Sequence, residues 1–199
     1  LEVSGVFDLT INRAKLTGLH MDKVKASIAS FDSLYLRELS LKGYVAPSTR
    51  PGASTEGLGG YVLSSKPGIY KNVLVLDFKS LYPSIMRTFN IDPLSYVGTE
   101  ETDTEKYIIE PNDAAFKRKE GILPAMLSKL WKEREEARKE GNELARYAIK
   151  ILMNSMYGVL ASQNYRFHQR DLSNAITYFG QHLIKLTVSE LEKEGYEVI

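Results

Sequence analysis

The sequence predicts an α+β fold that combines a small sheet with long helices. Apolar residues recur at helical spacing in three long segments of the second half of the chain, which is typical of amphipathic helices. Two short β-rich runs, at 61–63 and 73–77, are separated by a Lys-Pro-Gly turn signal and predict two strands of one sheet.

The first part of the chain predicts one helix and then a loop. Apolar positions at helical spacing indicate a helix over residues 19–42, with Gly43 as its C-cap. A stretch rich in Pro, Ser, Thr and Gly, from Pro47 to Gly60, predicts a loop that separates two units. Farther along, residues 98–120 mix charged and polar side chains with few apolar ones, so we expect an irregular insertion there.

A helical hairpin is predicted after this insertion. Pro124 suits the first turn of a helix that ends near Gly141, and Asn142 suits the N-cap of a second helix that runs to about residue 160. The short Gly-Asn turn predicts that these helices are antiparallel. A third amphipathic helix is expected over residues 172–194, followed by a strand-like run at the end of the chain.

Composition limits the classes of function. With 43% hydrophobic and 26% charged residues, the chain can bury a core. Its longest apolar runs are far shorter than the roughly 20 residues of a membrane span, and no secretory signal opens it, so we expect a cytoplasmic protein. The absence of cysteine excludes thiolate metal sites and points to a hard cation such as Mg²⁺. A net charge of +1 does not decide whether the chain binds nucleic acid.

The first candidate site follows the predicted strand at 73–77. Asp77 would be held at the end of that strand, where a carboxylate is well placed to bind a metal ion. Ser80 to Tyr82 precede Pro83, and their backbone N–H groups would face an anion at the start of a helix. The alternative, which is the commoner role of a lone Asp, is that Asp77 simply caps the turn after the strand.

The second candidate site lies on the second helix of the hairpin. Lys150, Asn154 and Tyr157 fall within about 60° of one another on that helix. A cation, an amide and an aromatic ring on one face suit nucleotide binding. The alternative is a solvated lysine beside a half-buried tyrosine. The neighbouring stripe is apolar and is expected to pack inward: Ile149, Met153 and Met156.

A third candidate site consists of Arg134 and Arg138, one turn apart on the first helix of the hairpin. If the hairpin is antiparallel, their face can meet Lys150, and three cations would converge on one polyphosphate. Glutamates interleave with these arginines, so an ordinary exposed charged helix is the competing interpretation.

These motifs, in this order, resemble family B DNA polymerases. The segment Asp77–Ile85 matches D-x-x-S-L-Y-P-S-I of the first palm motif, and Lys150–Gly158 matches K-x-x-x-N-S-x-Y-G of the fingers motif. The helix from Ile122 to Arg134 is similar to the first fingers helix of the family. The flanks are most similar to the bacterial DNA polymerase II branch: residues 43–47, 59–62 and 90–93.

The resemblance implies a set of functional residues. Asp77 and the Phe78 carbonyl would bind catalytic Mg²⁺, with two ions in the complete enzyme, and Gly59 and Gly60 would contact DNA. Tyr82 would stack under the sugar and exclude a 2′-hydroxyl group. The implied nucleotide-binding residues are Ser80, Leu81, Tyr82, Arg134, Arg138, Lys150, Asn154, Tyr157 and Gly158.

Within that set the resemblance distinguishes roles. The backbone of Ser80 to Tyr82 would hold the β and γ phosphates. Arg134 and Lys150 would neutralise the triphosphate with help from Asn154, and Arg138 is a weaker candidate. Tyr157 with Gly158 would line the nascent base pair.

The resemblance also implies a domain organisation: an incomplete polymerase palm sheet with an antiparallel two-helix fingers hairpin. Residues 1–46 would link an exonuclease region to the palm. The remaining expected parts are the first part of the palm (47–97), a variable insertion (98–120), the fingers hairpin (121–160) and the second part of the palm (161–199).

The second palm motif of the family, Y-G-D-T-D-S, has no match in these residues. We therefore expect a palm and fingers fragment that is inactive alone. Its expected partners are primer-template DNA, deoxynucleoside triphosphates, and the rest of the polymerase chain or a second subunit. No membrane partner is expected, and self-association through the incomplete sheet is possible.

Two other classes of function stay open at this point. One is a non-catalytic pseudo-polymerase or scaffold that binds nucleotide or DNA, and the intact Asp77, Lys150 and Tyr82 argue against it. The other is an unrelated helical DNA-binding domain. The near-neutral charge and the lack of a helix-turn-helix spacing argue against that class.

Overall fold

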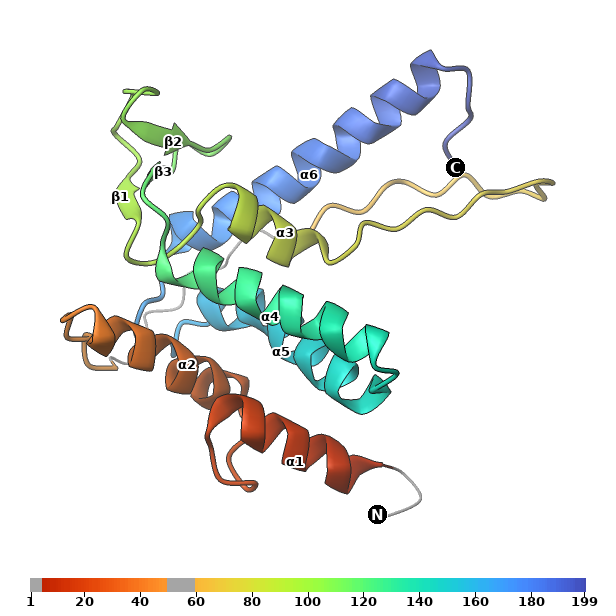
Figure 1. Cartoon of the computed structure of the whole chain (residues 1–199). Helices are drawn as coiled ribbons and strands as arrows, with labels where there is room; N and C mark the ends of the chain where they lie inside the picture. The colour runs from red at the N-terminus through yellow and green to blue at the C-terminus, as the bar shows by residue number, and fades with distance from the viewer. Residues whose placement is uncertain (1–4, 50–59) are drawn as a thin grey trace.

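The computed structural model describes residues 5–49 and 60–199. They form a helical body, a small sheet on one side of it and an extended arm (Figure 1), which confirms the predicted α+β class. The helices are α1 (Val6–Thr17), α2 (Ser27–Leu41), α3 (Leu81–Thr88), α4 (Ile122–Lys139), α5 (Glu143–Ala161) and α6 (Arg170–Lys193). The strands are β1 (Tyr96–Gly98), β2 (Tyr107–Ile109) and β3 (Ala115–Lys117).

Helix α2 occupies only the later part of the predicted 19–42 segment, and a separate helix, α1, precedes it. At the end of α2, the N–H groups of Gly43 and Tyr44 donate to the carbonyls of Ser40 and Leu39 at 2.9 and 3.1 Å. Gly43 has a φ of 78°, the left-handed conformation that this ending requires. The helix therefore ends as predicted at this glycine, but its C-cap is Lys42 and Gly43 is the next residue.

Helices α4 and α5 form the predicted hairpin. They pack side by side and are joined only by the turn at 140–142, so they run antiparallel (Figure 1). The Asn142 side chain accepts a hydrogen bond from the Ala145 N–H at 3.0 Å, as expected of an N-cap. The stripe predicted to pack inward is buried: Ile149, Met153 and Met156.

The two strands predicted at 61–63 and 73–77 are not formed. Residues 60–78, here called the arm, run extended from the helical body and project beyond it (Figure 1). Val62, Leu74 and Val75 are 85%, 79% and 89% exposed. Their sequence has strand propensity, but a strand also needs a neighbour for its backbone hydrogen bonds, and the arm forms no ladder with any other described segment.

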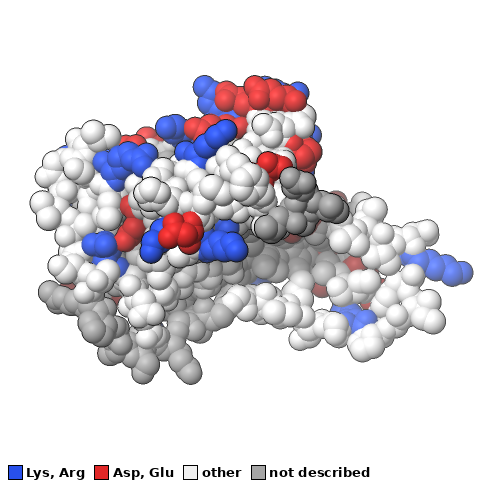
Figure 2. Space-filling model, turned by 90° about the horizontal axis from the view of Figure 1, so that it is seen from below, with Lys and Arg blue, Asp and Glu red and all other residues white. Residues whose placement is uncertain are grey.

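The arm is also poor in charge. Figure 2 shows positive and negative side chains interspersed over the helical body, whereas the part that projects to the right is mainly uncharged.

The arm contacts the last residues of the chain. Lys66 of the arm donates from Nζ to the Val198 carbonyl at 2.7 Å. The last residues, expected to be strand-like, contain no strand and lie against the arm at this contact.

The predicted irregular insertion at 98–120 instead contains most of the sheet. The strand order is β1-β3-β2 and both pairings are antiparallel. Ile108 pairs with Phe116, and Phe116 is completely buried. Each strand has three residues, so one or two apolar side chains are enough to pack it against the core. A segment with so few apolar residues shows no strand pattern, and for this reason the prediction of irregular structure was wrong.

The core lies where α2, α3, α4, α5 and α6 meet. Its fully buried members come from all of these helices and include Phe31, Ile85, Leu123, Met156 and Ile176. No helix in the described part of the chain is long and apolar enough to cross a bilayer. The core holds α3, which follows the arm directly, against α4, α5 and α6.

Candidate functional site

The first motif lies where the arm returns to the helical body. Asp77 is exposed and so is Phe78 at 42%. Ser80 then adopts the left-handed conformation, with φ 54° and ψ 58°, and α3 begins at Leu81, two residues before Pro83. The Ser80 side chain makes no capping hydrogen bond, so the first N–H groups of α3 remain available to a ligand, as at any helix N-terminus.

Arg134 connects this turn to α4. Its Nη1 donates to Ser80 Oγ at 3.0 Å, which brings a guanidinium group to the start of α3. Next to it, Lys79 Nζ lies 2.8 Å from Glu135 Oε1. This hydrogen bond lowers the pKa of Glu135. Two consecutive residues of the turn therefore contact two consecutive residues of α4.

Trp131 adds a second contact between the same two elements. Lys79 Nζ lies 4.9 Å and Arg87 Cζ lies 4.7 Å from the Trp131 ring centroid, within the range of cation–π attraction. Sequence reasoning missed Lys79, Arg87, Trp131 and Glu135. The sequence did contain a signal for two of them. Trp131 and Glu135 are one helical turn apart and next to Arg134, so they lie on the same side of the predicted helix.

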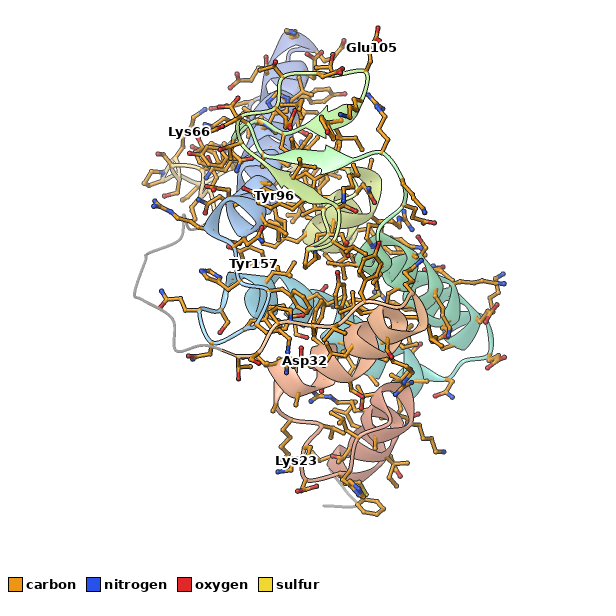
Figure 3. All side chains as sticks on the ribbon, turned by 90° about the vertical axis from the view of Figure 1, so that its left-hand side faces the viewer. Lys23, Asp32, Lys66, Tyr96, Glu105 and Tyr157 are labelled. Atoms are coloured by element: carbon orange, nitrogen blue, oxygen red, sulfur yellow. The ribbon has the colours of Figure 1, made fainter. Side chains whose placement is uncertain are left out.

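Tyr82 and Tyr157 bring the two sequence motifs into contact. Their ring centroids are 4.7 Å apart and the rings are tilted by 52°. Figure 3 shows Tyr157 between Tyr96 and Asp32 along the height of the molecule, where α5 approaches α3 and α6. Burial, and then the neighbouring Tyr82 phenol, raise the pKa of Tyr157.

The backbone at Gly60 also lies close to Tyr82. A β-carbon built on Gly60 would lie 3.1 Å from Tyr82 Oη, so the backbone passes close to the phenol. Gly59, the other glycine predicted to contact DNA, lies outside the described residues.

The remaining predicted residues of the hairpin are more open. Lys150 and Asn154 are exposed on α5, and a β-carbon built on Gly158 would meet open space among the described residues. Arg138 Nη1 pairs with Glu135 Oε2 at 3.4 Å. Among the described contacts none joins Arg138 or Lys150 to Arg134, so their convergence on one polyphosphate stays a prediction.

The described residues do not make up a complete metal site. They contain no group of three or more His, Asp or Glu side chains that could hold a metal ion. Asp77 contributes one carboxylate, whereas a hard divalent cation takes about six oxygen ligands. Magnesium bound by Asp77 and the Phe78 carbonyl therefore stays a prediction.

A buried polar network fixes the N-terminal end of α4. Asp92 is fully buried and its Oδ1 accepts from Tyr35 Oη at 3.0 Å and from the Leu123 N–H at 2.8 Å. Its Oδ2 accepts from the N–H groups of Leu94 and Ser95 at 2.8 and 3.1 Å. Burial raises the pKa of Asp92, and these hydrogen bonds oppose that rise.

Asn90 and Gly121 complete this network. Asn90 has a φ of 56°, and its Oδ1 accepts from the Gly121 N–H at 2.8 Å. A β-carbon on Gly121 would lie 2.6 Å from Asp92 Cβ, so the position has no room for any other residue. In the sequence, residues 90–93 stood out only for their resemblance to the family. The signal for this network is their Asn-x-Asp spacing, which favours side-chain to backbone hydrogen bonds.

Comparisons with known proteins place this arrangement in one family. The family model described as DNA polymerase family B matches residues 24–198. DNA polymerase II of Escherichia coli (strain K12) is 40% identical over 195 residues, and a DNA polymerase of Desulfurococcus sp. (strain Tok) is 34% identical over 155 residues. These matches cover 98% and 71% of the chain.

A solved structure agrees with the sequence matches. The family B DNA polymerase from the hyperthermophilic archaeon Pyrobaculum calidifontis has a TM-score of 0.79 and 28% identity, and the match covers 98% of the chain. The chain spans 25% of the Escherichia coli protein, 20% of the Desulfurococcus protein and 28% of the Pyrobaculum chain.

Proposed function

The chain belongs to DNA polymerase family B, and from this premise we propose that it forms the palm and fingers part of a DNA-directed DNA polymerase. The reaction would add deoxynucleotides to the 3′ end of a primer on a template. The observation that carries the proposal is the contact of Tyr82 with Tyr157, which joins the two motifs. In addition, Arg134 of α4 contacts Ser80 of the first motif.

The triphosphate would bind at the start of α3. The first N–H groups of α3 and the Arg134 guanidinium face the same turn at Ser80, and both favour an anion. Lys150 on α5 is exposed and available to a ligand. Asn154 lies one turn away and would assist it, while Arg138, which pairs with Glu135, has the weakest support.

The sugar and base would lie beside the tyrosine pair. Tyr82 is half-buried and supported from the side by Tyr157, so its ring can act as a firm surface under a deoxyribose. A 2′-hydroxyl group would then meet the ring, which gives a physical basis for selecting deoxynucleotides. Tyr157 and the open Gly158 would line the nascent base pair.

Catalysis would need groups beyond those described. Two-metal nucleotidyl transfer requires carboxylates that hold two ions about 4 Å apart, and Asp77 alone does not supply them. We therefore propose that residues 1–199 do not polymerise DNA by themselves. The missing carboxylates would come from the rest of the polymerase chain or from a second subunit.

The arm suggests where that completing part binds. It is extended, unpaired within the described residues and largely apolar on its surface, with Leu74, Val75 and Leu76 at least 76% exposed. An unpaired edge of this kind accepts another strand. Strands that pair with the arm would complete the palm sheet and hold Asp77, while Gly60 would lie near the DNA.

Primer extension with Mg²⁺ and four deoxynucleotides tests the proposal. We expect the full-length gene product that contains this chain to extend a primer, and the 199-residue chain not to do so. Asp77→Ala should abolish extension by the full-length protein, whereas the exposed control Asp103→Ala should retain it. Deoxynucleotide binding without extension by the full-length protein would favour a pseudo-polymerase instead.

A further inference from the structure

Tyr82 is closely approached by three residues that are far apart in the sequence. A β-carbon built on Gly180 of α6 would lie 3.1 Å from Tyr82 Cε1, and one built on Gly60 would lie 3.1 Å from Tyr82 Oη. The Tyr157 ring is the third neighbour, 4.7 Å away between ring centroids. A side chain at either glycine would therefore press on the Tyr82 side chain.

Gly180 is an unfavourable residue for its position. It lies within the long helix α6, is buried, and does not have a positive φ. Alanine in a helix interior is more stable than glycine by about 1 kcal/mol, so the backbone gives no reason for glycine here. The contact with Tyr82 does, because a β-carbon at 3.1 Å forces the ring to move by a few tenths of an ångström.

We propose that Gly180 is a positioning residue that sets how far the Tyr82 ring reaches into the nucleotide site. The proposal rests on the role proposed above for Tyr82 as the surface under the sugar. Gly180 would thereby set the KM for deoxynucleotides and the discrimination against ribonucleotides, although it touches neither substrate.

The direction of the effect follows from the packing around the ring. The Tyr82 ring contacts Tyr157 of α5 and lies close to the backbone of α6 at Gly180. A β-carbon on Gly180 pushes the ring away from α6, and we expect the ring to move toward α5, the helix that carries Lys150, Asn154 and Tyr157. The ring then takes room from the sugar, which weakens nucleotide binding and leaves still less space for a 2′-hydroxyl group.

The substitutions Gly180→Ala and Gly180→Ser separate this contact from helix stability. Both add the same β-carbon, but alanine favours the helix whereas serine favours it much less. In the full-length gene product, both should raise the KM for dATP by about 3- to 10-fold, with kcat changed by less than about twofold. Both should also raise the ratio of kcat/KM for dATP over ATP by at least about threefold. Ser189→Ala, at an exposed position of the same helix, is the matched control and should change neither quantity.

Gly60 offers an independent test with a rescue. Gly60→Ala places its β-carbon against Tyr82 Oη and should raise the KM in the same way. Tyr82→Phe removes that oxygen, so the double variant Gly60→Ala/Tyr82→Phe should regain a KM close to that of Tyr82→Phe alone. A variant that merely unfolds would not be rescued by losing a hydroxyl group.

Tyr82→Ala distinguishes failure of this inference from failure of the proposed function. If Tyr82→Ala lowers sugar discrimination but the Gly180 variants keep the parental KM and ratio, the role of Gly180 is wrong and the role of Tyr82 stands. If Tyr82→Ala leaves discrimination unchanged, the proposed role of Tyr82 fails and the inference on Gly180 fails with it. A raised KM in both Gly180 variants, together with the Gly60 rescue, supports the inference.

Discussion

Helix α4 is held in different ways at its two ends. At the N-terminal end, the fully buried Asp92 accepts four hydrogen bonds, one of them from the Leu123 N–H of α4. Toward the C-terminal end, the contacts with the turn before α3 include the Lys79–Glu135 pair and the Trp131 ring, and the two charged side chains are 54% and 32% exposed. The carboxylate of the first set is fully buried, whereas the second set is partly exposed to water.

This difference predicts which part of α4 can move. A hydrogen bond to a buried charged group contributes about 1.5–3 kcal/mol, whereas an exposed ion pair contributes about 0–1 kcal/mol and weakens in salt. The N-terminal end therefore acts as a fixed point. Arg134 lies in the second half, and its hydrogen bond to Ser80 Oγ is only partly buried, so we expect the guanidinium proposed to bind the triphosphate to leave Ser80 more easily than Leu123 leaves Asp92.

The largest expected effect comes from removing the fixed point. Asp92→Ala leaves the Leu123 N–H and the Tyr35 hydroxyl buried without their acceptor, and should lower the free energy of unfolding by about 3–5 kcal/mol. Urea denaturation of the 199-residue chain measures it.

Asp103 provides the matched control for Asp92. It also accepts from the N–H groups two and three residues ahead, at 3.0 and 3.1 Å, but it is exposed. Asp103→Ala should therefore cost less than about 1 kcal/mol. Equal losses in the two variants would show that burial of the network does not matter.

Glu110 is a second buried carboxylate, but unlike Asp92 it has no hydrogen bonds within the described part of the chain to oppose the effect of burial on its pKa. Glu110 is 3% exposed and neither side-chain oxygen has a hydrogen-bond partner among the described residues. Burial raises the pKa of Glu110 from 4.5 to about 8. Between these values the folded state holds a proton that the unfolded state has lost, so stability is highest below the lower value and falls as the pH rises through the upper one.

Glu110→Gln should remove this pH dependence. The variant has no carboxyl group to ionise, so between about pH 5 and pH 9 it should lose about 2–4 kcal/mol less stability than the parent. Thermal unfolding across this range measures the difference, with the exposed Glu120→Gln as control. Parallel pH profiles for the parent and the Glu110 variant would contradict the prediction.

Gly121, which packs tightly against Asp92, gives a second test of how firmly the N-terminal end of α4 is held. Gly121→Ala places a β-carbon 2.6 Å from Asp92 Cβ and 2.7 Å from Ser95 Oγ, and should destabilise the chain by about 1–3 kcal/mol. In Gly158→Ala the new β-carbon meets open space within α5, and the helix should gain up to about 1 kcal/mol. Chemical denaturation should therefore give effects of opposite sign.

The smallest effect is expected at the weakly held half. Lys79→Met removes the contacts with Glu135 and Trp131 and should change stability by less than about 1 kcal/mol. Because Trp131 is the only tryptophan of the chain, its fluorescence reports the loss of the nearby ammonium group directly.

Lys193→Met is the control for Lys79→Met, because it removes another exposed pair, with Glu190, that joins no two elements. It should leave the Trp131 emission unchanged. A loss from Lys79→Met as large as that from Asp92→Ala would mean that both ends of α4 are held alike.

Helical parts of the molecule were predictable from local patterns. The Asn142 cap, the Gly43 ending and the inward stripe of α5 each depend on residues within a few positions of one another. The arm was not predictable in this way. Its apolar run has the composition of a strand, but strand formation depends on a partner that local sequence does not specify.

The sequence by itself determined the three long helices of the second half, the two nine-residue motifs and, through them, the family, because helix periodicity and motif spacing are properties of neighbouring residues. Only the tertiary structure decided which of these residues meet. The contacts of Tyr82 with Tyr157 and Gly180, of Arg134 with Ser80, and of Asp92 with Tyr35 all join separate elements. Such contacts depend on how the helices pack around one core, and no spacing along the chain encodes that packing directly.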